Sequence, residues 1–219
     1  MIPTIVTDNF FKDPDNISSF IKSLNFSDAD KKYPGLRTKC LSEIDYNLYN
    51  SIVTKVLGLF YTFDQMVVEY KTHLFAQKID SKYKKGWVHK DYPAIFTFVI
   101  YLNKNYPLDA GTSIYKVKDE YVTKTTHEML SNNIDLKKQS FIDTSLINEK
   151  DINDNNKFFE ETINISSVYN RMIAFDANNF HAQNNLNYEE DRITLVGFVE
   201  AVDNPSSLPL PRINSFINI

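Results

Sequence analysis

The chain has 219 residues, of which 42% are hydrophobic and 24% charged, with a formal net charge of -4. This composition is ordinary for a globular protein and excludes a disordered chain, and the acidic balance does not favour sequence-independent binding to nucleic acid phosphates. The single cysteine, Cys40, excludes an intramolecular disulfide and a thiolate metal cluster and favours a reducing compartment.

We expect neither secretion nor membrane insertion. Residues 1–11 lack a basic start followed by an apolar stretch, and the sequence contains no uncharged apolar run of about 18 residues. The expected location is therefore cytoplasmic, without membrane binding. P-loop and dinucleotide-binding fingerprints are also missing from the sequence.

The amino-terminal part is expected to be helical. After Asp13-Pro14, apolar residues recur at helical spacing, with the proline where a first turn tolerates it: Ile17, Phe20, Ile21 and Leu24. A second helix is expected from about Ser42 to Phe60, with an apolar stripe formed by Tyr49, Ile52, Val53, Val56, Leu57 and Phe60. These helices, within residues 1–65, would support a sheet.

Strands are expected from residue 66 onward. From Val67 to Ile79 the pattern changes to a period of two, with one face formed by Val68, Tyr70, Thr72, Leu74 and Ala76. Further β-rich runs are Gly86–Lys90, Ile95–Leu102, Thr112–Val117, Tyr169–Asp176 and Arg192–Ala201. Helices followed by closely spaced strands predict a mainly β fold, a double-sheet jelly roll supported by amino-terminal helices.

The predicted domain organisation is a single domain of residues 1–219. Its jelly-roll core would comprise residues 66–118 and 167–203, and residues 204–219 would form a tail. Residues 119–166 are rich in Asn, Asp and Lys, and we interpret them as an insertion, either a lid or a partly disordered loop.

One short motif carries metal chemistry. In the segment Trp87-Val88-His89-Lys90-Asp91, the histidine and the aspartate are two residues apart, so on a strand both side chains leave the same face. An imidazole and a carboxylate supply two of three protein ligands for an octahedral Fe(II) that keeps open positions. His181 qualifies as the third ligand because it follows the strand expected to end at Asp176.

Arg192 opens an otherwise apolar strand. A guanidinium at such a position is costly to bury unless it has a fixed anionic partner. Its planar fork of donors matches the two oxygens of a carboxylate. A bound dicarboxylate would be such a partner.

These residues resemble the 2-oxoglutarate and Fe(II)-dependent dioxygenases, most closely the prolyl 4-hydroxylase-like branch. The similarity runs from about Trp87 to Val199 and rests on three blocks. They are His89-Lys90-Asp91 followed by Thr97 to Asn103, the strand from Gly111 to Tyr115, and Asn170 to Phe175 followed by His181 and Arg192 to Leu195. A second glycine often seen in the middle block is Ala110 here, and residues 119–166 have no counterpart in the family.

The resemblance implies a dioxygenase that uses Fe(II), 2-oxoglutarate and O2 to hydroxylate a C–H bond, releasing succinate and CO2. It implies His89, Asp91 and His181 as iron ligands and Arg192 at the distal carboxylate of the co-substrate. Tyr101 would hydrogen-bond that carboxylate, and Thr97 would line the same pocket. The primary substrate, an organic or peptidyl molecule, and the oligomeric state are left open, because fold-level analogy does not decide them.

Two other functions stay open on the sequence alone. One is a non-catalytic jelly-roll binding or structural module, such as a virion-associated protein. The other is a cupin-type metalloenzyme, which would require His73 at the metal as well. Asp176 or Asp109 could replace Asp91 as the carboxylate, although both are expected to stabilise loops. Trp87 is expected in the core, and His127 is expected to be solvated within the insertion.

Overall fold

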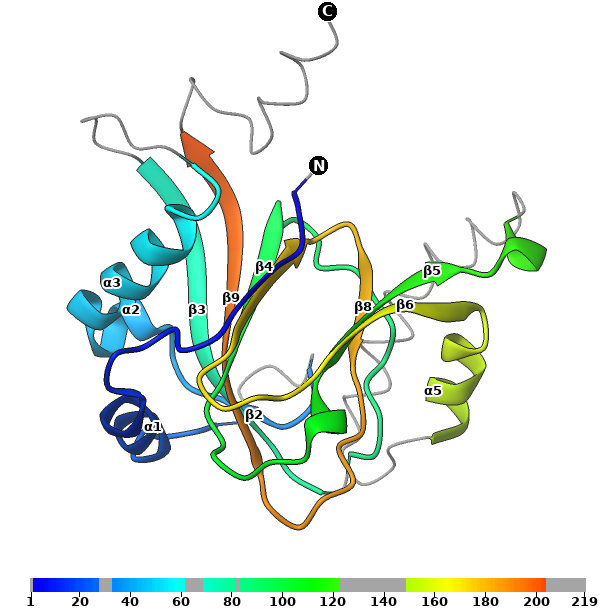
Figure 1. The fold of residues 1–219 in the computed structure, drawn as a ribbon, viewed down its shortest axis with the longest axis horizontal. Coiled ribbons are helices and arrows are strands. Elements are labelled where there is room, and N and C mark those ends of the chain that lie inside the picture. The colour runs from blue at the N-terminus through cyan, green and yellow to red at the C-terminus, as the bar shows by residue number, and fades with distance from the viewer. Residues whose placement is uncertain (1, 28–32, 62–68, 82, 123–148, 204–219) are drawn as a thin grey trace, which may run out of the picture.

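Two antiparallel sheets form the centre of this computed structural model, which describes residues 2–27, 33–61, 69–81, 83–122 and 149–203 (Figure 1). The larger sheet has the strand order β1-β7-β4-β9-β3-β2, and the smaller sheet has the order β6-β5-β8. The strands are β1 (Ile5–Thr7), β2 (Leu36–Arg37), β3 (Glu69–Ile79), β4 (Phe96–Tyr101), β5 (Thr112–Val117), β6 (Phe159–Ile165), β7 (Met172–Asp176), β8 (Phe180–Gln183) and β9 (Arg192–Asp203).

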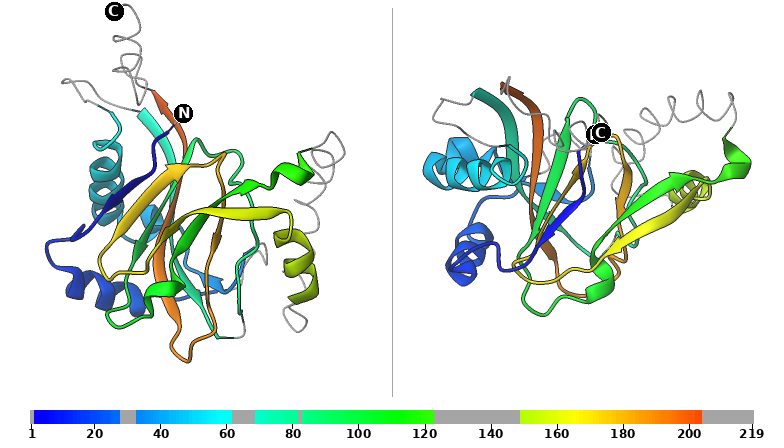
Figure 2. Two further views of the ribbon diagram at one scale, coloured as in Figure 1. Left: turned by 45° about the vertical axis from the view of Figure 1, so that its right-hand side comes forward. Right: turned by 45° about the horizontal axis from the view of Figure 1, so that its top comes forward.

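The amino-terminal helices lie on the face of the larger sheet that points away from the smaller sheet (Figure 2). The helices are α1 (Pro14–Lys22), α2 (Leu41–Ile44), α3 (Tyr46–Leu57) and, later in the chain, α5 (Glu149–Asn156), with short 3-10 turns at Leu108–Ala110 and Asp119–Tyr121. Helix α1 follows the prediction, with Asp13 as its amino-terminal cap and Pro14 in its first turn. None of the described helices is long and apolar enough to cross a membrane.

The predicted single helix from Ser42 to Phe60 is wrong, because the chain forms two helices there. Asp45 has an extended backbone between α2 and α3, and its carboxylate accepts a hydrogen bond from the Leu48 amide at 2.9 Å. Aspartate is more favourable as the residue that caps the start of a helix than at a position inside one. The second helix ends at Leu57, before Phe60.

Strand β3 shows the predicted alternation. Thr72, Leu74 and Ala76 are buried toward the helices, and the strand pairs with β9 from Glu69↔Asp203 to Ile79↔Arg192 with one irregularity. The expected first residues of this strand, Val67 and Val68, lie outside the described residues. The expected strand from Tyr169 begins only at Met172, because Asn170 has a positive φ of 61° and binds both backbone groups of Phe11.

The two faces of β4 belong to different layers of the core. Phe96, Phe98 and Ile100 join the large apolar cluster beneath the helices. Val99 and Tyr101 instead join a smaller cluster that includes Ile114 of the opposite sheet. The period of two along a strand explains this division. The space between the two sheets is therefore lined by the odd-numbered face of β4.

The range interpreted as an insertion contributes regular structure that the sequence did not predict. Strand β6 pairs with β5 from Thr112↔Ile165 to Val117↔Phe159, and α5 precedes it. Only the ends of β6 are buried, and apolar residues alternate with polar ones only in its last part, at Ile163 and Ile165. The rest of the range, residues 123–148 with His127, and the predicted tail 204–219 lie outside the described residues.

Candidate metal centre

His89 and His181 lie side by side on two antiparallel segments. The amide of each donates a hydrogen bond to the carbonyl of the other, at 3.0 and 2.9 Å, and their ring centroids are 4.5 Å apart. His181 lies on the short strand β8, which the sequence did not predict. The expected strand Gly86–Lys90 is wrong, because this segment makes only the one bridge at His89. Because the two histidines are directly opposite each other in this bridge, their imidazoles still extend from the same side of the two paired segments.

Gly86 allows this segment to approach β8. Its amide donates to the Gln183 carbonyl at 3.0 Å. A β-carbon at this position would lie 2.7 Å from the backbone nitrogen and oxygen of Gln183. Because backbone atoms cannot yield as a flexible side chain can, the close approach requires glycine.

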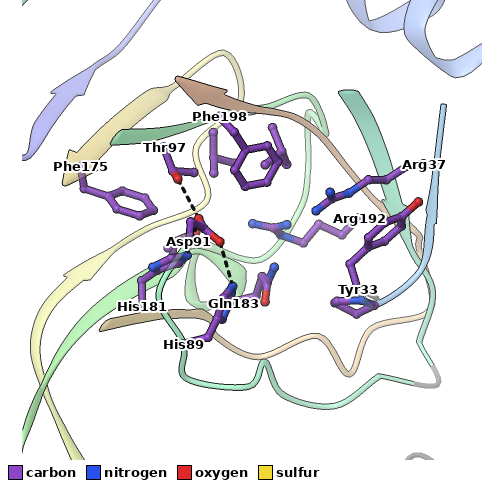
Figure 3. Close-up of a pocket in the computed structure, with 14 residues that line it drawn as sticks. Tyr33, Arg37, His89, Asp91, Thr97, Phe175, His181, Gln183, Arg192 and Phe198 are labelled. Carbon is purple, nitrogen blue, oxygen red and sulfur yellow. Dashed lines mark hydrogen bonds and ion pairs between the residues drawn. The ribbon is translucent and has the colours of Figure 1, made fainter. Parts of the chain in front are cut away.

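Asp91 completes a compact group with the two histidines (Figure 3). Its Oδ1 lies 3.3 Å from Nε2 of His89, and its Oδ2 lies 3.1 Å from Nε2 of His181. All ligand atoms of the three residues lie within 4.8 Å of one another. Two ligands at right angles on one ion, with bonds of about 2.0–2.2 Å, would be about 3 Å apart. The three side chains therefore fit a single metal ion on one face of an octahedron.

Both imidazoles are oriented by backbone carbonyls. Nδ1 of His89 lies 2.7 Å from the Trp87 carbonyl, and Nδ1 of His181 lies 3.0 Å from the Asn179 carbonyl. A carbonyl oxygen only accepts, so each Nδ1 donates to its carbonyl, and Nε2 is the atom that each ring would offer to a metal ion. Metal-binding histidines commonly have this arrangement.

The carboxylate of Asp91 is held ionised. Burial acts to raise its pKa, but the nearby imidazoles of His181 and His89 outweigh burial and lower the pKa well below its usual value. The Thr97 hydroxyl also donates to Oδ2 at 2.7 Å. This hydrogen bond fixes the orientation of the carboxylate. Asp91 is therefore prepared to act as a charged ligand.

A cavity of about 280 Å³ lies against the three residues. This is close to the lower end of the range for small-molecule sites, ~300–1,000 Å³. Much of its wall is apolar, formed by Val99, Phe175, Val196 and Phe198. Polar groups enter from Thr112, Gln183, Arg37 and Arg192, and Asp91 is the only carboxylate among the described lining residues.

Arg192 reaches this cavity from the first residue of β9, and Figure 3 shows its guanidinium directed toward Asp91. The residue is only 2% exposed, and burial lowers its pKa. Its Nε donates to the Ala110 carbonyl at 3.2 Å, whereas the buried Nη2 finds no hydrogen-bond partner among the described residues. A buried cationic donor without a partner in a cavity indicates a site for an anion.

Thr97 and Tyr101 are both near the cavity, but their hydroxyl groups already have partners. Thr97 lines the cavity, as predicted, and donates to Asp91. Tyr101 is buried, donates to the Thr112 hydroxyl at 2.9 Å, and has the Arg192 guanidinium 5.3 Å from its ring centroid. Tyr101 therefore supports two groups that line the cavity.

The other candidate ligands lie elsewhere. His73 faces Glu200 at 3.4 Å and is not part of the three-residue group, so the structure does not support the cupin-like arrangement. Asp176 accepts hydrogen bonds from the amides of Ile2 and Asn178, and Asp109 from the side chain of Asn185, as expected for residues that stabilise loops. Trp87 is buried in a separate apolar cluster.

Arg37, Tyr33 and Gln183 line the cavity but were missed by the sequence analysis. No local pattern marks them, because Arg37 reaches the cavity only through the pairing of the two-residue strand β2 with β3. The arginine in an apolar context was a usable signal at Arg192. Arg37 lacks this context, because it is followed by the polar residues Thr38 and Lys39.

Solved structures with a similar fold are 2-oxoglutarate and Fe(II)-dependent oxygenases. HygX from Streptomyces hygroscopicus, with nickel and 2-oxoglutarate bound, matches with a TM-score of 0.53 at 11% identity, over 89% of this chain and 82% of HygX. A prolyl hydroxylase from Trichoplax adhaerens, in complex with a hypoxia inducible factor peptide fragment, matches with a TM-score of 0.52 at 11% identity, over 90% of this chain and 82% of the hydroxylase. The predicted jelly roll is confirmed: the chain has the double-stranded β-helix fold of these oxygenases.

The sequence matches the model of DUF6445, a family of unknown function, over residues 2–190. The chain belongs to this family. No curated protein matches it in sequence. Since the family description assigns no activity, the function must be argued from the site.

Proposed function

We propose that this chain is a 2-oxoglutarate-dependent Fe(II) dioxygenase that hydroxylates a C–H bond of a small-molecule or peptidyl substrate. One oxygen atom of O2 would enter succinate, formed with CO2 from 2-oxoglutarate, and the other would enter the new hydroxyl group. The oxidation of the 2-oxo acid and of the C–H bond together supply the four electrons that O2 accepts.

The observation that carries this proposal is the convergence of three side chains on one point. Beside them lies a buried guanidinium whose Nη2 has no hydrogen-bond partner among the described residues. His89, Asp91 and His181 present Nε2, a carboxylate and Nε2 within 4.8 Å of one another. Two imidazoles and one carboxylate with open positions are the ligand set of non-haem Fe(II) oxygenases. Arg192 lies in the wall of the same cavity with Nη2 unpartnered among the described residues.

Each residue has a defined task in this proposal. His89, Asp91 and His181 would hold Fe(II), and Arg192 would bind the distal carboxylate of 2-oxoglutarate. Thr112 lines the same cavity and accepts a hydrogen bond from Tyr101, and its hydroxyl would assist at that carboxylate. Thr97 would keep the Asp91 carboxylate in its ligating orientation. These are positioning tasks that do not involve bond breaking.

When bound, the iron supplies the activation of O2 that the protein side chains cannot supply themselves. The chain contributes geometry and exclusion of water. The Nδ1 hydrogen bonds to Trp87 and Asn179 keep both rings in the ligating orientation. The apolar wall of Val99, Phe175, Val196 and Phe198 limits water around the reacting groups.

Metal stoichiometry and product formation test the proposal together. Metal-free protein should bind one equivalent of Fe(II) without oxygen, and in air with ascorbate and 2-oxoglutarate it should release succinate. His181→Ala should abolish both, whereas His73→Ala, a histidine outside the group, should preserve both. Fe(II) binding that survives in His181→Ala, or tight Fe(II) binding without any 2-oxoglutarate turnover, would refute the proposal.

A further inference from the structure

A second arginine, Arg37, lines the same cavity as Arg192 from the edge strand β2, which is separated from the β9 strand of Arg192 only by β3. Strand β2 places it directly across from Gln77 of β3, so both side chains share one face of the sheet. Gln77 is in turn opposite Thr194 of β9, two residues from Arg192. In Figure 3 the Arg37 guanidinium points into the pocket, beyond that of Arg192 as seen from Asp91.

Arg37 is only partly exposed and has few polar contacts among the described residues. Its guanidinium carbon lies 3.8 Å from the Tyr33 ring centroid and 5.3 Å from that of Phe198. Among the described residues the guanidinium makes one hydrogen bond, a long one of 3.5 Å from Nη2 to Gln77, and its buried Nε has no partner there. Burial lowers its pKa to about 10, so it remains positively charged at neutral pH.

Stacking on the Tyr33 ring leaves the N–H groups of the Arg37 guanidinium available as hydrogen-bond donors. A ring against the face of a guanidinium does not use its N–H groups, which point outward in the plane. The free edge of Arg37 is therefore suited to a planar, two-oxygen acceptor. A carboxylate has this shape and the opposite charge.

Among the described lining residues, the charges of the cavity leave one positive charge unbalanced. With Fe(II) bound, the metal and the two arginines would bring four positive charges. Asp91 and a doubly charged 2-oxoglutarate would bring only three negative charges, and Asp91 is the only acidic residue among the described lining residues. An unpaired charge in a buried site is costly. A second anionic ligand would compensate it.

The two arginines differ in the pockets that they line. Arg192 is almost fully buried and belongs to the inner cavity alone. Arg37 is partly exposed and, with Asp91 and Phe198, also lines an adjoining, more open pocket of about 310 Å³. That outer pocket also contains Tyr92, which is 90% exposed, and Glu200, whose carboxylate is paired with Lys71 at 2.5 Å. Arg37 thus lies between the metal-binding residues and an entrance large enough for a second molecule.

We infer that the primary substrate is a carboxylate-bearing organic molecule, whose carboxylate binds Arg37 while its body occupies the outer pocket beside Asp91. This inference rests on the proposed function, because it assigns Arg192 to the co-substrate and Arg37 to the substrate.

The test uses full-length protein loaded with Zn(II), which has no redox chemistry and is diamagnetic. The Arg37 Nε–H resonance is assigned by its loss in Arg37→Lys. With 2-oxoglutarate saturating, amino acids and simple carboxylic acids are then titrated, each beside its own amide, up to about 20 mM, where even weak binding is detectable. At least one acid should shift this resonance saturably while its amide does not.

Calorimetry on variants completes the test. Arg37→Met should weaken binding of that acid by about tenfold or more while 2-oxoglutarate affinity changes by less than about threefold. Lys84→Met, which removes a surface charge paired with Glu149, is the matched control and should change neither. Arg192→Met should have the reverse pattern, with 2-oxoglutarate binding lost.

Several results would overturn the inference. They are the failure of every acid to shift the Arg37 resonance, equal shifts by acids and amides, or loss of 2-oxoglutarate binding in Arg37→Met but not in Arg192→Met. Each of these leaves the proposed dioxygenase function standing if wild-type protein binds Zn(II) and 2-oxoglutarate. Failure of the wild type to bind either one would instead contradict the proposed function itself.

Discussion

The two faces of the larger sheet have different chemistry, although the same strands form both. Toward the helices, Phe96, Phe98 and Ile100 of β4 pack in an apolar cluster. Toward the smaller sheet, the alternate residues include Thr97 and Tyr101, and β9 adds Arg192. Buried polar groups on this second face are expensive unless a ligand satisfies them. One face therefore stabilises the fold, and the other is arranged for binding.

The largest expected effect is on the helix-facing side. Phe98→Ala should lower the free energy of unfolding by about 3–5 kcal/mol, because it leaves a cavity in a fully buried cluster. Denaturant unfolding measures this change. Leu108→Ala, at a side chain that is 61% exposed, is the control and should change stability by less than about 0.5 kcal/mol. A loss below about 1 kcal/mol for Phe98→Ala would contradict the proposed division between the faces.

Arg192→Met tests the binding face. We expect 2-oxoglutarate affinity to fall by about 100-fold, near 2.7 kcal/mol, because a charged donor pair to a carboxylate is removed. Stability of the ligand-free protein should not fall comparably, since the lost guanidinium has one unpaired nitrogen in the described structure. Calorimetry and thermal unfolding give the two values. A variant that unfolds easily but binds 2-oxoglutarate normally would assign Arg192 to the fold instead.

A smaller effect is expected at Thr97, which touches the metal-binding group indirectly. Thr97→Val keeps the shape of the side chain but removes the hydrogen bond to Asp91. Metal affinity should fall by about tenfold, as for other residues that orient a ligand, and Thr97→Ser should restore most of it. Competition with a chelator measures the affinity. Equal affinities in the wild type and Thr97→Val would show that the hydroxyl does not position Asp91.

The smallest effect is expected far from both faces, at the ion pair of Asp8 with Arg171. Two hydrogen bonds of 2.6 and 2.9 Å join them, and they lower the pKa of Asp8. A lowered pKa stabilises the fold above the unfolded value near 3.8, and this contribution disappears as pH falls through the folded value. Asp8→Asn should therefore cost less than about 1 kcal/mol at pH 7 and nothing at strongly acidic pH. A cost that stays constant with pH would rule out the ion pair as its cause.

Local patterns in the sequence predicted the parts of the molecule that depend on local chemistry. Helix α1 has a capping residue and an apolar stripe, and β3 and β9 have clear alternation or apolar runs. Strand β6 was missed because its exposed middle is polar, and β8 because four residues are too few for a pattern. The position of Arg37 depends on the pairing of β2 with β3, which no local pattern encodes.

The site shows the same limit. The spacing of His89 and Asp91 suggested a common metal, and the structure brings both next to His181. The strand that was expected to present them is replaced by a single bridge between the two histidines. The resemblance to a family supplied Arg192 as a partner for the co-substrate. A shared outer pocket that also includes Arg37 could be recognised only after folding.

The most direct test of the account is anaerobic titration of the Fe(II)-loaded protein with 2-oxoglutarate while recording visible absorption. Chelation of Fe(II) by the 2-oxo acid gives a charge-transfer band, which requires both the metal and two adjacent open positions on it. We predict a saturable band in wild-type protein and none in Asp91→Ala. Fe(II)-loaded wild-type protein that develops no band at saturating 2-oxoglutarate would contradict the central claim.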